Sequence, residues 1–205
     1  MKPEYWDKAK RALAKRDPVM ATIMRAHPKI FLAKRGDPFV TLARAICGQQ
    51  ISVKAAQAVW DRLVVCCSTI EPRTILSKKR TELRACGLSD RKVEYIADLA
   101  QHFADGKIHM QRWPDMDDEA IIAELVEVRG IGRWTAEMFL MFNLLRPDVY
   151  PLDDLGLQKG LRLSYFKGRK ASISRMRKQG ELWRPWRSVA TWYLWRSLDP
   201  VPVEY

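Results

Sequence analysis

Residues 117–145 decide the fold and read DDEAIIAELVEVRGIGRWTAEMFLMFNLL. Apolar residues recur at helical spacing on both sides of Gly130-Ile131-Gly132. This pattern predicts two helices, Asp117–Val126 and Arg133–Leu145, joined by a tight turn. Acidic residues at the start of the first helix are a favourable N-terminal signal. Glycine permits backbone geometry that other residues resist, and an isoleucine between two glycines can anchor the turn in an apolar core.

The turn has the chemistry of a phosphate-binding site. A helix is expected to begin directly after Gly132, and the N–H groups of its first turn have no partner within the helix, so they can bind an anion. Arg133 adds a positive charge at the same end. A helix-hairpin-helix of this kind binds the DNA backbone without reading the base sequence. The alternative is a purely structural turn, because many helix–helix connections contain glycine.

The rest of the chain also has helical periodicity, with proline and glycine between the segments and no clear run of alternating strand pattern. Proline is expected at helix starts, because it fits the first turn. We therefore predict an all-α fold whose other helices cover Pro3–Lys15, Pro18–Ala26, Pro38–Gly48, Ser52–Cys66, Pro72–Leu76, Lys79–Cys86, Asp90–Asp105, Leu155–Leu163, Ile173–Gln179 and Trp186–Ser197.

Length and charge narrow the class of protein. The 205 residues suit one large domain or two small lobes that share a core. Lysine and arginine number 36 against 24 acidic residues, which gives a formal net charge of +12. Such a balance favours a polyanionic partner, nucleic acid first. A solvated basic surface without a partner is the alternative reading of the charge alone.

Several other classes are excluded by pattern. No stretch reaches the length of a membrane span, and the N-terminus lacks the apolar core of a secretory signal, so we expect an intracellular protein of the cytoplasm or nucleoid. Cys47, Cys66, Cys67 and Cys86 contain no C-x-x-C pair, which argues against a zinc or iron–sulfur site and favours reduced thiols.

Four ordered blocks of sequence carry a resemblance to a known family. They are AICGQQIS at 45–52, CGLSDRK at 86–92, the hairpin with the aspartate pair Asp153-Asp154 that follows it, and WRPWRSVA at 183–190 continuing to Trp195. On these blocks, about residues 38–197 resemble the helix-hairpin-helix DNA glycosylase superfamily. Within it the chain is most similar to the 3-methyladenine DNA glycosylase II family, in a compact form without the N-terminal β domain.

The resemblance implies a single glycosylase core over residues 1–205, made of two helical lobes with a cleft between them. The central lobe would span about residues 38–146 and would contain the hairpin at 117–145. The second lobe would combine about residues 1–37 with residues 147–205. The compact form is implied because the residues before Pro38 have a helical pattern.

The implied activity is that of a monofunctional DNA glycosylase. Such an enzyme excises alkylated bases of the 3-methyladenine type from duplex DNA by hydrolysing the N-glycosidic bond, and so initiates base excision repair. Water is the nucleophile, and no organic cofactor is implied. The family's hairpin often holds one sodium or potassium ion on backbone carbonyls, here those of Val126, Val128 and Ile131. The implied partner is double-stranded DNA with damaged bases. The protein would bind it as a monomer, and no membrane is involved.

Asp154 matches the superfamily's catalytic aspartate, because a helical pattern follows it directly. Loss of the base leaves positive charge on the sugar, and a carboxylate near C1′ can stabilise that charge or accept a proton from water. Asp153 is the runner-up. Any aspartate at this point can also cap the helix that follows, and we expect Asp153 to take that role.

Three residues match the positions that line the family's base pocket: Trp134, Met138 and Trp195. Relatives that also cut the DNA strand have a Schiff-base lysine where this chain has Trp134, so the resemblance implies no lyase activity. An aromatic wall suits a methylated, positively charged purine. Met138 departs from the family, which has an aromatic residue there, and this leaves the range of lesions open. A core tryptophan is the alternative for Trp134 and Trp195.

A damaged base must leave the duplex before it can react. Gln50 falls where family members insert a side chain into the gap that remains, and a capping or structural role for Gln49 and Gln50 is the alternative. The DNA backbone would be held by a set of residues on the hairpin: Gly130, Ile131, Gly132, Arg133 and Thr135.

Two rival functions stay open at this stage. One is a non-enzymatic helix-hairpin-helix DNA-binding module, although a protein that only grips DNA needs neither Asp154 nor Trp134. The other is a glycosylase for deaminated bases, which differs in pocket shape rather than in motif.

Overall fold

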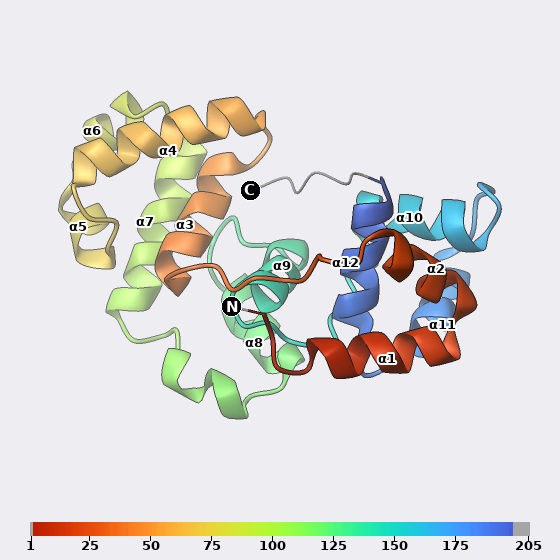
Figure 1. Ribbon diagram of the computed structural model, residues 1–205. Coiled ribbons are helices and arrows are strands. Elements are labelled where there is room, and N and C mark those ends of the chain that lie inside the picture. The colour runs from red at the N-terminus through yellow and green to blue at the C-terminus, as the bar shows by residue number, and fades with distance from the viewer. Residues whose placement is uncertain (1, 199–205) are drawn as a thin grey trace. The chain divides into compact units, whose positions relative to one another are not determined.

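The computed structural model describes residues 2–198, which contain helices, turns and loops but no strand (Figure 1). The predicted all-α fold is therefore confirmed for this part of the chain. The elements are α1 (Trp6–Arg16), α2 (Pro18–Ala26), α3 (Pro38–Gly48), α4 (Val53–Cys67), α5 (Pro72–Ser77), α6 (Arg80–Ala85), α7 (Asp90–Ala104), the 3-10 helix η1 (Met110–Asp115), α8 (Asp118–Val126), α9 (Arg133–Phe142), α10 (Leu155–Tyr165), α11 (Ile173–Glu181) and α12 (Arg187–Leu198).

Side-chain caps explain many of the helix starts. Asp37 accepts the N–H of Val40 at 3.0 Å before α3, and Ser52, Ser89, Asp117 and Ser172 do the same before α4, α7, α8 and α11. Each of these side chains satisfies one of the N–H groups that a helix leaves unpaired. Proline at the first position of α2 and α3 adds a preset backbone angle, and both helices have the bounds that the sequence predicted.

Three sequence predictions need correction. Pro3 does not begin a helix, because α1 starts at Trp6, whose N–H donates to the carbonyl of Pro3 at 3.0 Å. Helix α9 ends at Phe142 rather than Leu145, because Leu145 has φ of 55° and the N–H of Arg146 turns back to Leu140. Residues 110–115 were not expected to be helical, yet they form η1.

The chain divides into two compact units. The central unit is Arg35–Phe139, and its long helix α7 packs against α3, α5 and α6 (Figure 1). Helices α3 and α7 run antiparallel. Phe39 at the start of α3 packs edge-to-face against Phe103 at the end of α7, with ring centroids 5.2 Å apart. The core of this unit is apolar, and its fully buried members include Leu42, Ile46, Leu63, Ile75, Ile96 and Leu99.

The terminal unit consists of residues 2–34 and 140–198. Helix α12 packs against α1, α2 and α10 and carries the buried Tyr193. The start of α2 is anchored by Asp17, which caps the helix with Oδ1 and accepts Trp183 Nε1 (2.9 Å) and Tyr165 Oη (2.8 Å) with Oδ2. Burial and the bond to Asp17 raise the pKa of Tyr165 above its ordinary value. This buried acceptor ties three segments of the unit together.

Across residues 2–198, no helix combines the length and apolar character that a membrane crossing requires.

Candidate active site and DNA-contacting hairpin

The predicted hairpin is formed within the central unit by α8, a tight turn and the start of α9. The turn is closed by backbone hydrogen bonds from Val128 N to Leu125 O (3.2 Å) and from Ile131 N to Val128 O (3.1 Å). Val128 and Ile131 are buried, so the two apolar residues anchor the turn from inside, as the sequence predicted for Ile131.

The two glycines of the turn have different reasons to be glycine. Gly130 has φ of +82°, and a Cβ there would lie 2.3 Å from the ring of Tyr95 on α7. Its lack of a side chain therefore serves the fold. Gly132 has no atom within 4 Å of the place where its Cβ would be. Packing within the unit does not require glycine at 132, so the open backbone there is available to a ligand.

Side chains of the residue that follows α3 and of α7 hold the turn from outside. Gln49 Nε2 donates to Gly130 O at 2.8 Å, and the N–H of Arg129 donates to Asp98 Oδ2 at 2.8 Å. The carbonyl of Cys47, near the end of α3, accepts Lys92 Nζ at 2.8 Å. Burial lowers the pKa of the Lys92 ammonium. These bonds connect the hairpin to the end of α3.

Gln50 follows directly on that connection. It is exposed and has φ of 59°, a left-handed conformation that is uncommon for residues other than glycine. Gln49 has the structural role that was the alternative for the pair, because its side chain bonds to Gly130 O of the hairpin. Gln50 is the next residue, just past the end of α3, and hydrogen bonds connect this end of α3 to both the hairpin and α7.

Arg133, the predicted phosphate ligand, is held by two carboxylates. Its guanidinium donates to Glu119 at 2.8 and 2.5 Å, and its Nε donates to Glu137 at 3.1 Å. The hydrogen bonds to Glu119 raise the pKa of Arg133, and in turn Arg133 lowers the pKa of Glu119. Both Arg133 and Glu119 are largely exposed, so a DNA phosphate would have to compete with Glu119 for this guanidinium.

The first two turns of α9 carry the other predicted residues of the central unit. Trp134 is 45% exposed, so it is not a core tryptophan. Thr135 and Met138 are half-buried. Trp134 and Met138 are four residues apart and so lie on the same side of the helix, as the pocket prediction requires.

Asp154 lies in the terminal unit at the start of α10, and it is the N-cap of that helix. Its Oδ1 accepts the N–H of Leu157 at 2.6 Å and Trp195 Nε1 at 2.8 Å. The prediction that Asp153 caps the helix is therefore wrong: Asp153 is exposed, and the cap bond goes to its neighbour. The Asp154 carboxylate is therefore oriented by two donors on one oxygen, a backbone N–H of the helix N-terminus and the indole N–H.

Trp195 is fixed on its other side by an aromatic stack. Its ring and that of Phe142 are 6.0 Å apart at the centroids and inclined by 14°. Gly156 makes room for the arrangement, because a Cβ there would lie 3.0 Å from Asp154 Oδ1 and 3.1 Å from the Trp195 ring. Sequence reasoning missed Gly156 and the hydrogen bond from Trp195; the Leu155-Gly156-Leu157 pattern beside the aspartate was the only available signal.

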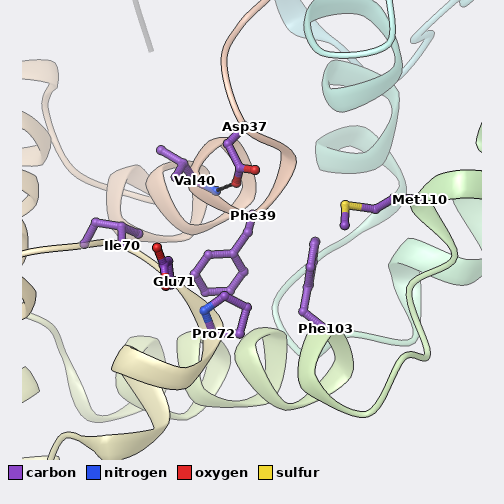
Figure 2. A pocket seen from close by; sticks show the side chains of 8 residues that line it. All are labelled: Asp37, Phe39, Val40, Ile70, Glu71, Pro72, Phe103 and Met110. Carbon is purple, nitrogen blue, oxygen red and sulfur yellow. Dashed lines mark hydrogen bonds between the residues drawn. The ribbon is translucent and has the colours of Figure 1, made fainter.

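A hollow of about 490 Å³ opens at the other end of α3 (Figure 2). Phe39, Phe103 and Met110 form apolar walls there, and Asp37 and Glu71 supply carboxylates. The 11-residue length of α3 separates this hollow from Gln50 by about 16 Å. Negative groups disfavour a nucleic acid, so this hollow is not a candidate DNA contact.

Residues 43–185 match the family described as HhH-GPD superfamily base excision DNA repair protein. The chain belongs to this superfamily. DNA-3-methyladenine glycosylase 1 of Schizosaccharomyces pombe is 33% identical over 168 residues, which cover 80% of this chain and 74% of that protein. The HhH-GPD match falls within residues 38–197, so the family resemblance drawn from the sequence blocks is confirmed.

Solved HhH-GPD structures agree. The DNA-3-methyladenine glycosidase of Bacillus halodurans superposes with a TM-score of 0.86 at 31% identity, covering 93% of this chain and 88% of that one. The S. pombe 3-methyladenine DNA glycosylase in complex with abasic DNA gives a TM-score of 0.78 at 31% identity, over 93% and 96% of the two chains. The helical glycosylase core that the sequence implied is thereby confirmed.

Within residues 2–198, no group of three or more histidine, cysteine, aspartate or glutamate side chains could hold a metal ion. The cation predicted for the hairpin uses other donors, namely backbone carbonyls. Of these, Val128 O already accepts the N–H of Ile131.

Proposed function

We propose that this protein is a monofunctional DNA glycosylase that excises alkylated bases of the 3-methyladenine type from duplex DNA. The observation that carries the proposal is the Asp154 carboxylate, held by the α10 N-terminus and Trp195 at the position that matches the superfamily's catalytic aspartate. The names of the relatives support the substrate class.

The reaction breaks the bond between C1′ and the base nitrogen and adds water at C1′. The products are a free base and an abasic sugar with a hydroxyl at C1′. As the base leaves, positive charge develops on the sugar, and the Asp154 carboxylate stabilises it and can take the proton from the attacking water. An N-methylated purine is already cationic and leaves readily, so the site needs no strong acid.

Binding of double-stranded DNA is assigned to the hairpin of the central unit. Gly130, Gly132 and Thr135 present backbone N–H groups at the turn and at the start of α9, and Arg133 adds charge. Ile131, whose N–H is bonded to Val128 O, supports the turn between the two glycines. Gln50 would fill the space left by the flipped base. Trp134 and Met138 on α9, with Trp195 of the terminal unit, would contact the base. A sodium or potassium ion on the carbonyls of Val126, Val128 and Ile131 belongs to the same proposal.

Strand cleavage is not part of the proposed activity, because Trp134 stands where a lyase has its Schiff-base lysine. Borohydride should therefore trap no covalent complex of the protein with DNA that contains abasic sites. A robust covalent adduct would show that another amine of the chain serves as the nucleophile.

The deciding experiment is incubation of the purified protein with methylated duplex DNA, followed by identification of the released base by mass spectrometry. Release of 3-methyladenine with formation of abasic sites is expected. DNA that contains hypoxanthine, assayed in parallel, tests the deaminated-base alternative. DNA binding without release of any base would favour a non-enzymatic binding module.

A further inference from the structure

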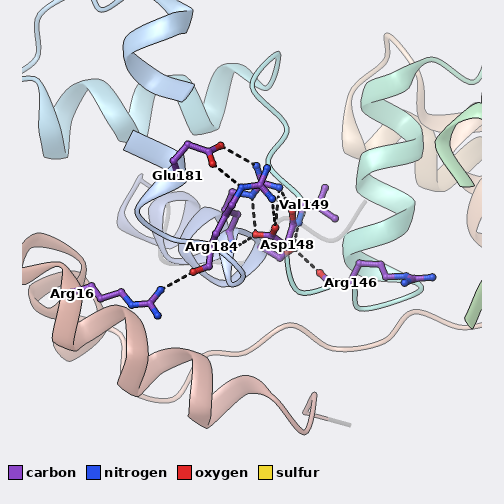
Figure 3. A network of polar contacts seen from close by, with 8 residues as sticks. Arg16, Arg146, Asp148, Val149, Glu181 and Arg184 are labelled. Carbon is purple, nitrogen blue, oxygen red and sulfur yellow. Dashed lines mark hydrogen bonds and ion pairs between the residues drawn. The ribbon is translucent and has the colours of Figure 1, made fainter. Parts of the chain in front are cut away.

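The loop that leads to Asp154 is fastened to the start of α12 by Asp148 (Figure 3). Asp148 Oδ1 accepts from Arg187 Nε at 2.8 Å and Asp148 Oδ2 accepts from Arg187 Nη2 at 3.0 Å, so the pair is bidentate. Arg184 Nη1 also donates to Oδ2, at 2.9 Å. The side chains of Asp148 and Arg187 are only 21% and 16% exposed. A half-buried bidentate pair of this kind is stronger and more directional than an exposed one.

Backbone bonds join the same two segments. The N–H of Arg187 donates to Asp148 Oδ1 at 3.3 Å, so Asp148 also satisfies an N–H at the start of α12. Ser188 donates its hydroxyl to Arg146 O at 2.6 Å and accepts the N–H of Val149 at 2.9 Å. The Ser188 N–H donates to Pro147 O at 3.0 Å. We call residues 146–149 together with Arg187 and Ser188 the loop clamp.

The loop and the helix meet again farther along. Six residues after Asp148 the loop reaches Asp154, and eight residues after Arg187 helix α12 reaches Trp195, whose Nε1 donates to Asp154 Oδ1. Eight residues of helix span about 12 Å. A helix is stiff over that length, so a rotation or slide of α12 at the clamp would move the Trp195 indole on Asp154.

We propose that Asp148 is a positioning residue for the Asp154 carboxylate. The loop clamp sets the rotation and height of α12 relative to the loop, and thereby keeps the Trp195 N–H on Asp154. This inference rests on the proposed function for its catalytic consequence. The geometric part, that Asp148 controls the Trp195–Asp154 hydrogen bond, stands independently of any activity.

The geometric part is tested by NMR of the indole N–H groups in 15N-labelled protein. Trp195→Phe identifies the Trp195 signal by its disappearance, and Asp154→Asn shows how far the signal moves when the charged acceptor is lost. Asp148→Asn should move the Trp195 signal in the same direction. Asp90→Asn is the matched control: Asp90 also accepts from two arginines, Arg80 and Arg84, but it lies in the central unit. An unmoved Trp195 signal in folded Asp148→Asn would overturn the proposal.

The catalytic part is tested by single-turnover base release on methylated DNA. Asp148→Asn should slow release about tenfold, because an indole hydrogen bond to a carboxylate contributes roughly a factor of ten. The affinity for abasic DNA should stay within about twofold of the wild-type value. In a Trp195→Phe background the same substitution should have little further effect, because the two act through one contact. Additive losses would overturn the positioning role.

Circular dichroism checks that each variant is folded, and a second, milder variant guards against an effect of misfolding. Ser188→Ala removes one link of the loop clamp without touching the charges, and it should change the Trp195 signal and the rate in the same direction as Asp148→Asn. If the wild-type protein releases no base, the proposed function fails, whereas the NMR comparison still decides whether Asp148 controls the Trp195 contact.

Discussion

The two proposed sites differ in the groups that would meet a ligand. In the hairpin of the central unit these are backbone N–H groups around Gly132, whereas at Asp154 of the terminal unit the group is a side chain. The hairpin is held by neighbours that bond its backbone, such as Gln49 on Gly130 O. Asp154 is held by a helix start and by Trp195, 41 residues later in the chain. A site built from backbone groups therefore needs open space, whereas a site built on a carboxylate needs oriented donors.

Among the substitutions that test this difference, Asp154→Asn should have the largest effect. Asparagine is as good an N-cap as aspartate, so α10 should keep its start while the charge proposed to stabilise the sugar cation is lost. Base release should fall about 10²–10³-fold, which corresponds to about 3–4 kcal/mol of transition-state stabilisation. Single-turnover release from methylated DNA measures this, with affinity for abasic DNA unchanged. Asp153→Asn is the matched control, and equal losses in both variants would remove Asp154 from its role.

Substitution of the two glycines by alanine should separate fold from function within the hairpin. Gly130→Ala puts a Cβ into the Tyr95 ring at a left-handed φ, and should lower the free energy of unfolding by roughly 2 kcal/mol or more. Gly132→Ala meets no atom of its own unit, so stability should hold, but a methyl group should lift a phosphate away.

Denaturant unfolding and DNA-binding titrations measure the two effects of the glycine variants. For Gly132→Ala we expect about threefold to tenfold weaker binding to damaged and undamaged DNA alike, because phosphate contacts carry no sequence information. Wild-type affinity in Gly132→Ala would mean that the hairpin is a structural turn.

Trp195→Phe tests how Asp154 is oriented. Phenylalanine can keep the stack on Phe142 but cannot donate to Oδ1. Base release should slow about tenfold, since the loss of one hydrogen bond to a charged group costs about 1.5 kcal/mol. The measurement is the single-turnover rate at saturating enzyme. A rate equal to that of the wild type would show that the α10 N-terminus alone orients the carboxylate.

The smallest expected effect concerns Arg133. Glu119→Gln removes one of the two charged partners of Arg133, the one that accepts from Nη1 and Nη2, and should free these two groups for a DNA phosphate while Nε stays on Glu137. The slope of log affinity against log salt should steepen by up to about one unit, the value for one added phosphate contact. Fluorescence titrations at several salt concentrations give this slope. An unchanged slope would mean that Arg133 does not contact DNA even when released.

The helical class, the hairpin and the aspartate before α10 could all be predicted from the sequence. Each of these is a local pattern: apolar spacing, glycines at a turn, or a carboxylate directly before a helix. The family followed because four such patterns occur in one order, and the HhH-GPD match confirms it. Alternatives that depend on a single residue, such as Asp153 or Asp154 as the helix cap, were not resolved in this way.

The partners that hold these groups follow from the packing of the helices and could not be predicted from local sequence. Three such observations depend on contacts between distant segments. Gly130 faces Tyr95 while Gly132 faces open space. Glu119 holds Arg133, and Trp195 donates to Asp154. Neighbouring residues in sequence carry no record of such contacts. The physical reason is that helix formation follows local spacing, whereas the direction of a hydrogen bond depends on how packed helices are rotated against one another, and a shift of about one ångström makes or breaks it.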